Sequence, residues 1–285
     1  MTEFVSVAID ATLITLVLAL AAFGLAIIFG LVGVINMGHG AMLTLGAYFA
    51  WWGVSVLGLP FPLAVLLATL GVALIGLALE HWIIRHFYDR PFDTLLLTWA
   101  FFIVSTEIIK LVFGSDFRNI GNPMSGAVEF AGLSFPAYRS LVAIISLGVI
   151  ALTALIIFRT TYGIQIRALI QNREVSSLLG LNVALTYKAV FCLGAGMAGM
   201  AGALIAPMMS IDPYMGNVFL VRSFFVVIVG GIGHLLGGTL LGSFLIGGSE
   251  TLFALFSDQV VAQTMVFLLA IVVLRFRPQG VLSDK

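Results

Sequence analysis

The sequence has 285 residues, of which 61% are hydrophobic and only 9% are charged, and its formal net charge is zero. With a mean hydropathy of +1.17, this composition excludes an ordinary soluble domain, in which about 25% of residues are charged. The zero net charge argues against a nucleic-acid-binding surface, and the single cysteine excludes an internal disulfide. We therefore expect an all-α integral membrane protein, because helices satisfy their own backbone hydrogen bonds in lipid.

The hydrophobic residues fall into stretches that approach the length of about 20 residues needed to cross a bilayer. In chain order these stretches are 8–33, 41–57, 61–83, 94–113, 138–158, 186–208, 219–235, 237–256 and 260–275. Several are short of a full span and others contain Gly or Pro, so the sequence predicts eight or nine crossings. No Lys or Arg precedes the first stretch, which favours a retained membrane helix over a cleaved signal peptide.

Lys and Arg predict the orientation, since they accumulate in cytoplasmic connections. Nine crossings would place nine of the thirteen basic residues on one side, namely Arg85, Arg90, Arg159, Arg167, Arg173, Lys188, Arg275, Arg277 and Lys285. The other side would hold Lys110, Arg118, Arg139 and Arg222. We therefore expect the N-terminus outside and the C-terminus in the cytoplasm. The longest cytoplasmic connection is then 159–187, and the longest external one is 114–137.

Two segments, 33–40 and 230–238, interrupt the hydrophobic pattern with glycines and with polar Asn36, His39 and His234. Interrupted segments at comparable places in two related halves are typical of a transporter's central site. The alternative is a pair of glycine-rich loops, since Gly is common in membrane helices. We expect residues 36–40 of the first break to approach residues 230–238. The candidate solute-path residues are Asn36, Gly38, His39, Gly40, Thr98, Gly233 and His234.

Three of these polar residues also have a structural interpretation. Asn36 and His39 would cap the ends of a broken helix, and the Thr98 hydroxyl would bond to a preceding carbonyl. Small residues recur every four positions at Gly194, Ala198 and Gly202, which predicts close helix packing.

The connection 159–187 contains a helical mixture of apolar and polar residues over 165–179, and it ends at Gly180. We predict a short amphipathic helix with Gly180 just beyond its C-terminus. Such a helix either lies on the membrane surface or docks into a partner's groove, and periodicity alone favours the membrane surface.

This connection resembles the coupling loop of permeases in the branched-chain amino-acid branch of ABC importers, through Arg167-Ala168 and Leu179-Gly180-Leu181-Asn182. Segment 33–40 resembles the break after the first helix in that family. Segments 229–233, 237–242 and 275–280 resemble its later Gly-rich and Arg-Pro-x-Gly motifs. These matches follow the family's order from about residue 20 to 282.

Two sub-branches of the family compete. Segments 91–99, 121–123 and 128–129 resemble urea permeases, but Arg222 stands where those have an acidic residue, and the break at 36–39 also departs from the usual pattern. The resemblance therefore leaves open a branched-chain or other amino acid, or urea or another short amide.

The resemblance implies a single transmembrane permease domain, 1–285, in a bacterial inner membrane. Its partners would be an identical or sister permease, two cytoplasmic ATPases and a solute-binding protein. The residues expected to couple to an ATPase are Arg167, Asn172, Arg173, Glu174, Leu179 and Gly180. The chain has no P-loop pattern, so we expect it to be no enzyme and to carry no cofactor. ATP and Mg²⁺ would bind the partner ATPase.

Two other functional classes each require residues in a definite arrangement. A stand-alone channel or secondary transporter would need acids near mid-membrane, and Glu250 is the only reasonable candidate. A membrane-embedded enzyme would need clustered Asp, His or Cys, whereas the acids are scattered. His81 and His86 lack the further ligands of a metal site, so we predict no metal.

Overall fold

The computed structural model describes residues 2–130 and 133–282, and helices make up most of them. The first half holds α1 (Thr2–Val32), α2 (His39–Ser55), α3 (Phe61–Trp82), η1 (Ile84–His86) and α4 (Pro91–Phe113). A hairpin of β1 (Ala127–Phe130) and β2 (Leu133–Pro136) leads to α5 (Ala137–Arg159), α6 (Thr161–Gln171) and α7 (Arg173–Leu178). Then come α8 (Val183–Ile205), η2 (Ala206–Met208), α9 (Met215–Gly230), α10 (Leu235–Ser243), the π-helical turn η3 (Phe244–Gly248), α11 (Ser249–Ala254) and α12 (Gln259–Phe276).

All nine hydrophobic stretches contain helix. In the described part of the chain, seven helical segments are long and apolar enough to span a membrane, and α9 is a shorter apolar helix of 16 residues. α2 has 17 residues. The all-α membrane class is confirmed, and the chain is a multi-pass membrane protein. The relation between its two halves stays a prediction.

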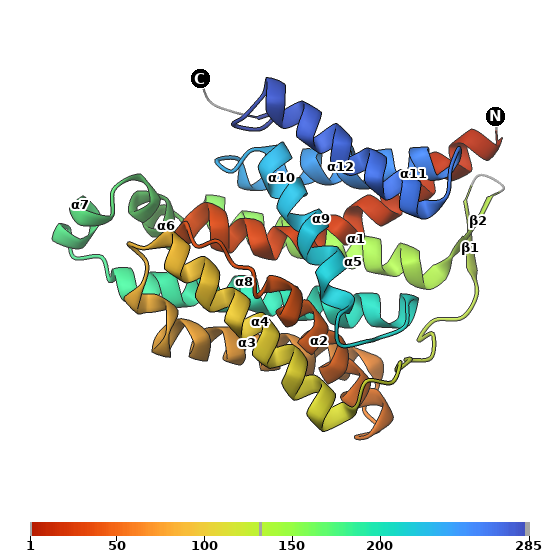
Figure 1. Ribbon diagram of the computed structural model, residues 1–285, viewed down its shortest axis with the longest axis horizontal. Coiled ribbons are helices and arrows are strands. Elements are labelled where there is room, and N and C mark those ends of the chain that lie inside the picture. The colour runs from red at the N-terminus through yellow and green to blue at the C-terminus, as the bar shows by residue number, and fades with distance from the viewer. Residues whose placement is uncertain (1, 131–132, 283–285) are drawn as a thin grey trace.

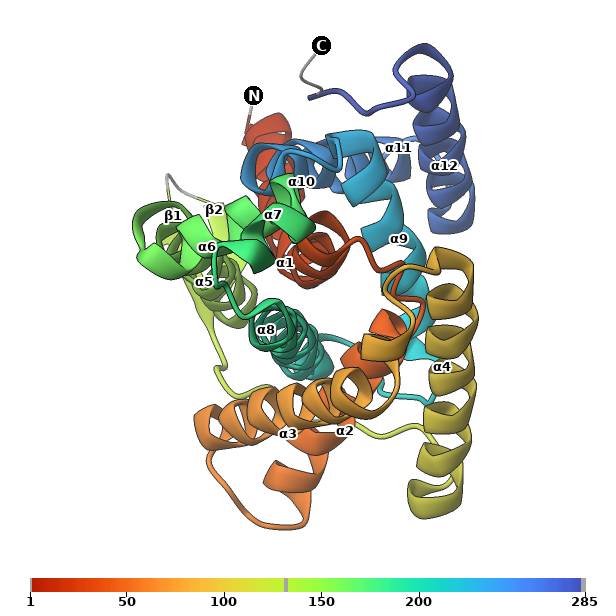
Figure 2. The ribbon, with the colours of Figure 1, turned by 90° about the vertical axis from the view of Figure 1, so that its left-hand side faces the viewer.

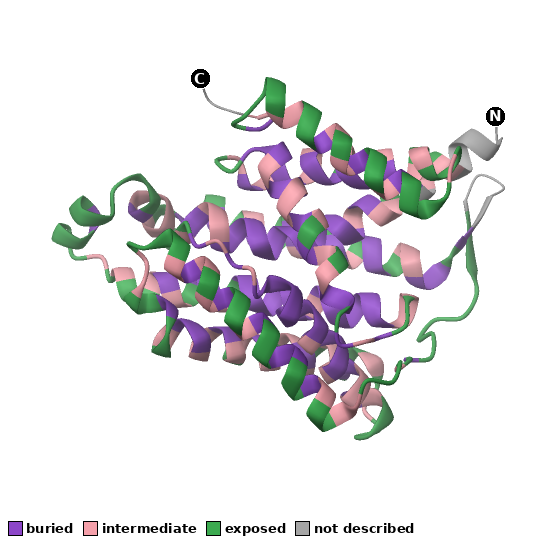
Figure 3. Ribbon diagram, viewed as in Figure 1, coloured by how far each residue is buried: buried purple, intermediate pink, exposed green. Residues whose placement is uncertain are grey.

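The bundle is built around α8, which packs against α1, α2 and α3 (Figure 2). In the most apolar 18-residue stretch of each helix, 78% of the residues are buried in α8 and 72% in α1, but only 17% in α12. Burial is accordingly concentrated in the middle of the bundle, while the outer helices expose apolar side chains (Figure 3). This arrangement suits lipid, which replaces water around the outer helices.

Small residues bring the central helices into backbone contact, as the four-residue spacing predicts. A Cβ at Gly194 would lie 2.8 Å from the carbonyl oxygen of Gly24 on α1. A Cβ at Gly199 would lie 2.6 Å from Cβ of Val72 on α3. A Cβ at Gly202 would collide with the backbone of Leu43 on α2. The predicted stripe therefore serves packing.

Both predicted helix breaks are present. Residues 33–36 are irregular between α1 and α2, and Gly33 has a φ of +75°. Residues 231–234 separate α9 from α10, and Gly231 has a φ of +108°. These positive φ angles are readily adopted only by glycine, which explains why the hydrophobic pattern stops where it does.

The connection predicted as 114–137 carries more structure than a plain loop. Its hairpin pairs Ala127 with Pro136 in antiparallel register. Arg118 and Ile211 exchange two backbone hydrogen bonds of 2.9 and 2.8 Å. The connection is thereby tied to the segment between α8 and α9, at the end of the bundle opposite α6 and α7 (Figure 1).

The single helix predicted over 165–179 is wrong in its bounds, because two helices, α6 and α7, meet at Asn172. Asn172 has extended backbone, and its side-chain oxygen accepts a hydrogen bond of 3.0 Å from the Val175 amide. Asn is a favoured N-cap, so it starts a new helix where periodicity alone continues the old one. The role of Gly180 is confirmed: its φ is +86°, and the Leu181 amide bonds to the Ser176 carbonyl, as after many helix ends.

Because α2 packs closely against α8, we expect the fold to be sensitive to a side chain at Gly46. A Cβ added there would collide with the backbone of Gly199. Gly46→Ala should destabilise the fold by about 1–3 kcal/mol through overpacking, lowering the thermal unfolding temperature in detergent. The matched control is Gly148→Ala in α5, where a Cβ would meet nothing within 4 Å. Equal unfolding temperatures for the two variants would contradict this packing.

Candidate functional site

The first break buries its two polar side chains. Asn36 and His39 both have no exposed surface. The His39 Nε2 atom lies 2.8 Å from the Ala21 carbonyl oxygen of α1, and the Asn36 amide donates to the Met42 sulfur at 3.7 Å. Both side chains therefore face protein, as expected of polar groups at membrane depth. Their contact with a solute stays a prediction.

Helix α4 holds this break from the side. The Met37 amide donates to the Thr98 hydroxyl at 3.0 Å, and that hydroxyl donates back to the Thr94 carbonyl at 2.9 Å. A Cβ at Gly38 would lie 2.7 Å from the Phe101 ring. The expected bond from Thr98 to a preceding carbonyl is confirmed. The same hydroxyl also satisfies a backbone amide that the break leaves without a helical partner.

The first turn of α2 crosses the first turn of α9. A Cβ at Gly40 would lie 2.8 Å from the Gly216 carbonyl oxygen, and the Gly216 amide donates to the Thr44 hydroxyl at 3.1 Å. Glycine is needed at both positions because the two backbones touch.

The second break lies at the other end of α9. Gly233 and His234 line a cavity of about 360 Å³ together with Arg167 of α6. The Arg167 guanidinium donates to the carbonyl of Ile157 at the end of α5. One residue expected to couple to an ATPase therefore shares a cavity with two residues expected along the solute path.

The expected meeting of the two breaks is wrong. Gly40 contacts α9 at Gly216, whereas Gly238 packs against Gly230 at the other end of α9. These contacts are 14 residues apart, or about 21 Å along a helix. The reason is the direction of the irregular segment, which runs back along α1 until His39 reaches Ala21, 18 residues earlier. Of the residues on either side of the first break, those at the end of α1 approach the second break, where Gly30 lies beside Ile232.

The C-terminal segment closes over the second break. The amides of Val281 and Leu282 donate to the carbonyls of Val229 and Gly230 at 2.8 and 3.2 Å. Gly280, with a φ of +89°, lies against Gly231. The glycine-rich segment and the Arg-Pro-x-Gly segment are thus two sides of one contact, which the sequence did not reveal.

The segment 159–187 is anchored by Arg173. Its guanidinium lies 3.0 Å from the Asp89 carboxylate and stacks over the rings of Tyr88 and Tyr187, 5.8 and 5.6 Å from their centroids. Tyr88 donates to Glu80 at 2.6 Å, and burial, followed by this hydrogen bond, raises the Tyr88 pKa. Arg173 therefore contacts the turn between α3 and α4.

The outer surface of this segment is apolar at its tip. Leu178 and Leu179 are 86% and 76% exposed, and Asn172, Glu174 and Gly180 are also exposed. Two adjacent exposed leucines beyond the end of the membrane bundle are suited to a protein partner.

One ion pair was missed by the sequence interpretation. Arg222 of α9 and Glu250 of α11 lie 2.6 Å apart, with side chains only 15% and 12% exposed. The sequence pattern places Arg222 among the external basic residues and Glu250 as an acid near mid-membrane, without linking the two. The sequence signal for this pair is that each residue is a lone charge of opposite sign in an apolar helix, and such charges generally pair.

Comparisons with known proteins agree on one family. Its sequence model, described as the permease component of branched-chain amino acid transport systems, matches residues 7–275. The chain is 26% identical over 283 residues to the high-affinity branched-chain amino acid transport system permease protein LivH of Salmonella typhimurium, covering 93% of this chain and 91% of that protein. It is 28% identical over 282 residues to the corresponding BraD of Pseudomonas aeruginosa, with the same coverage. No solved structure matches the chain significantly.

The hydrogen bond between Met37 and Thr98 predicts a local effect of Thr98→Val. Removing the hydroxyl leaves a backbone amide of the first break unpaired, which costs about 1–3 kcal/mol. Hydrogen exchange followed by mass spectrometry should show faster exchange in peptides covering 33–38. The control is Thr69→Val, whose hydroxyl bonds only within α3, to Val65. Unchanged exchange at 33–38 would contradict the clamp.

Proposed function

The chain belongs to the family of permease components of branched-chain amino acid transport systems, and from that membership we propose that it forms the membrane path for an aliphatic amino acid in an ABC importer. The observation that carries the proposal is the family match over residues 7–275. The relatives from Salmonella and Pseudomonas are both named as branched-chain amino acid permeases. These names support an amino acid over urea as the solute.

The proposal includes partners that supply energy and solute. The chain has no P-loop pattern, so ATP would be bound by two separate cytoplasmic ATPases, with Mg²⁺. A solute-binding protein would deliver the amino acid, and a second permease, identical or sister, would complete the path. Large apolar side chains exposed along α4 and α12, including Leu111 at 84% and Phe276 at 80%, are available to lipid or to that second subunit.

We propose that α6 and α7 dock into the ATPase. They lie together at one end of the bundle (Figure 1), and the basic residues expected in the cytoplasm are concentrated in their connection and in the C-terminal segment. Leu178 and Leu179 would enter the partner's groove. With this end inside, the N-terminus faces outward and the C-terminus lies in the cytoplasm. The membrane is then a bacterium's inner membrane.

Reconstitution tests the proposed function directly. The chain would be co-expressed with candidate ATPases and a candidate binding protein from the same organism, purified as a complex and placed in liposomes. We expect ATP-dependent uptake of leucine, isoleucine or valine. Uptake of urea in place of these amino acids, or uptake without ATP, would refute the proposal.

The exposed leucines give a specific prediction for docking. Leu178→Asp should reduce co-purification of the ATPase by about tenfold or more, because it places a charge in an apolar contact. The amount of permease in the membrane should stay the same. The matched control is Phe117→Asp, a 71% exposed apolar residue at the opposite end of the bundle. Loss of the ATPase in the Phe117 variant alone would reverse the proposed orientation.

The contact between Arg173 and Asp89 predicts a defect in coupling. This ion pair is exposed enough to contribute only about 0–1 kcal/mol to stability, so Arg173→Ala should fold and still bind the ATPase. Without its links to Asp89, Tyr88 and Tyr187, movement of α7 would reach the α3–α4 turn less directly. We expect several-fold less solute transported per ATP hydrolysed, as measured by parallel uptake and phosphate release.

The charge-exchanged variant Arg173→Asp with Asp89→Arg provides the control. It should restore part of the lost coupling by remaking the ion pair. Wild-type coupling in the Arg173→Ala protein would argue against this route.

A further inference from the structure

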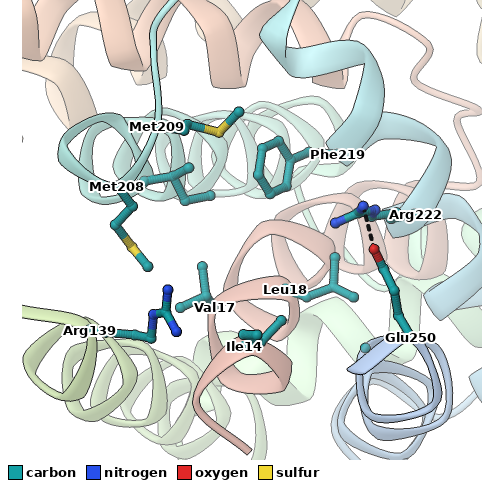
Figure 4. A pocket seen from close by; sticks show the side chains of 11 residues that line it. Ile14, Val17, Leu18, Arg139, Met208, Met209, Phe219, Arg222 and Glu250 are labelled. Carbon is teal, nitrogen blue, oxygen red and sulfur yellow. Dashed lines mark hydrogen bonds and ion pairs between the residues drawn. The ribbon is translucent and has the colours of Figure 1, made fainter. Parts of the chain in front are cut away.

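A second cavity lies at the end of the bundle opposite α6 and α7, between α1, α8, α9 and α11 (Figure 4). Its volume is about 150 Å³. Its walls include the side chains of Val17, Leu18, Met208, Phe219, Arg222 and Glu250. It is thus an apolar chamber with one ion pair in its wall, and Arg139 at the start of α5 lies across the chamber from that pair.

The ion pair has bonding capacity left over. One Arg222 nitrogen, Nη2, donates to Glu250 Oε1 at 2.6 Å. The Arg222 Nε atom is buried and has no hydrogen-bond partner among the described residues. Arginine presents five donors in a planar fork that matches a carboxylate, and a buried donor without an acceptor is costly. The site is therefore suited to a further anionic oxygen beside Glu250.

The chain is locally distorted where it presents Glu250. Residues Phe244–Gly248 form a π-helical turn directly before α11. Such turns are rare and occur frequently at functional sites. A Cβ at Gly247 would lie 3.2 Å from the Thr15 hydroxyl oxygen of α1, so the turn brings α11 close to the chamber wall. Glu250 thereby reaches Arg222 across the chamber's edge.

We infer that this chamber is a binding site for the zwitterion of a small aliphatic L-amino acid. Arg222 takes the α-carboxylate, Glu250 takes the α-ammonium group, and the wall of Val17, Leu18 and Phe219 takes the side chain. The inference rests on the proposed function, since it places the importer's solute in the permease itself, on the side where we propose delivery.

Charge balance selects for a zwitterion. A ligand with only a carboxylate would compete with Glu250 for Arg222 and leave a buried charge without a partner, which is strongly unfavourable. A zwitterion supplies a partner to each member of the pair, and its own charges are paired in turn. A cavity of about 150 Å³ holds a benzene-sized apolar group, so an isobutyl or isopropyl side chain fits beside the charged groups.

Photo-crosslinking tests the site in the full-length chain. The protein in lipid nanodiscs would be irradiated with photo-leucine, the diazirine analogue of leucine, and digested for mass spectrometry. We expect labelling at Val17, Leu18 or Phe219. L-Leucine should compete for labelling. 4-Methylpentanoate, which lacks the ammonium group, and 3-methylbutylamine, which lacks the carboxylate, should compete about tenfold less well or worse. Labelling only at other positions, or equal competition by all three, would overturn the inference.

Variants of the ion pair provide the second measurement. Arg222→Gln with Glu250→Gln removes both charges together, which avoids a lone buried charge, and labelling should fall by about tenfold or more. Should this protein fail to fold, Arg222→Lys keeps the charge and loses the fork, and labelling should fall several-fold. The matched control is Lys110→Gln with Glu107→Gln, which removes the ion pair of 2.7 Å on α4 and should leave labelling unchanged. Wild-type labelling in both Arg222 variants would overturn the inference.

The uptake assay separates this inference from the proposed function. ATP-dependent leucine uptake by the complete importer, combined with no labelling of the chamber, overturns the inference alone. Labelling of the chamber without any leucine uptake supports the site and refutes the proposed function.

Discussion

Backbone amides and carbonyls have no water to bond to inside a bilayer, and two interrupted helices leave several of them without helical partners. The first break is stabilised from α4, where Thr98 accepts from Met37. The second is stabilised by the C-terminal segment, whose Val281 and Leu282 amides bond to the end of α9. Each break therefore depends on a segment distant in the sequence, and the surrounding helices pack so as to supply those contacts.

Helix α9 connects the two helix breaks with the ion pair of Arg222 and Glu250. It touches the first break at Gly216, carries Arg222 about two turns later, and ends at Gly230 beside the second break. Tilting or sliding α9 would change all three contacts together. With 16 residues, α9 is also shorter than a full span, so its position depends on packing against neighbours rather than on its own fit to the bilayer.

At the end of the bundle where α6 and α7 lie, these two helices are joined to the membrane helices at two places. Arg167 shares a cavity with Gly233 and His234 at the second break, and Arg173 holds the turn between α3 and α4 through Asp89. The ATPase that we propose, by moving α6 and α7, would therefore act on both halves of the chain. This contiguous chain of packed groups is a physical basis for coupling.

The sequence by itself determined the membrane class, the nine helical stretches, both helix breaks and the turn at Gly180, because hydropathy and glycine placement act over a few neighbouring residues. Its periodicity predicted one continuous helix across Asn172, where the side chain of Asn172 instead caps the start of a new helix. Only the tertiary structure decided that the two breaks lie at opposite ends of α9 and that Arg222 pairs with Glu250, 28 residues away. Those contacts depend on which helix faces which, and helix packing is set by the shapes of surfaces that the linear pattern does not order in space.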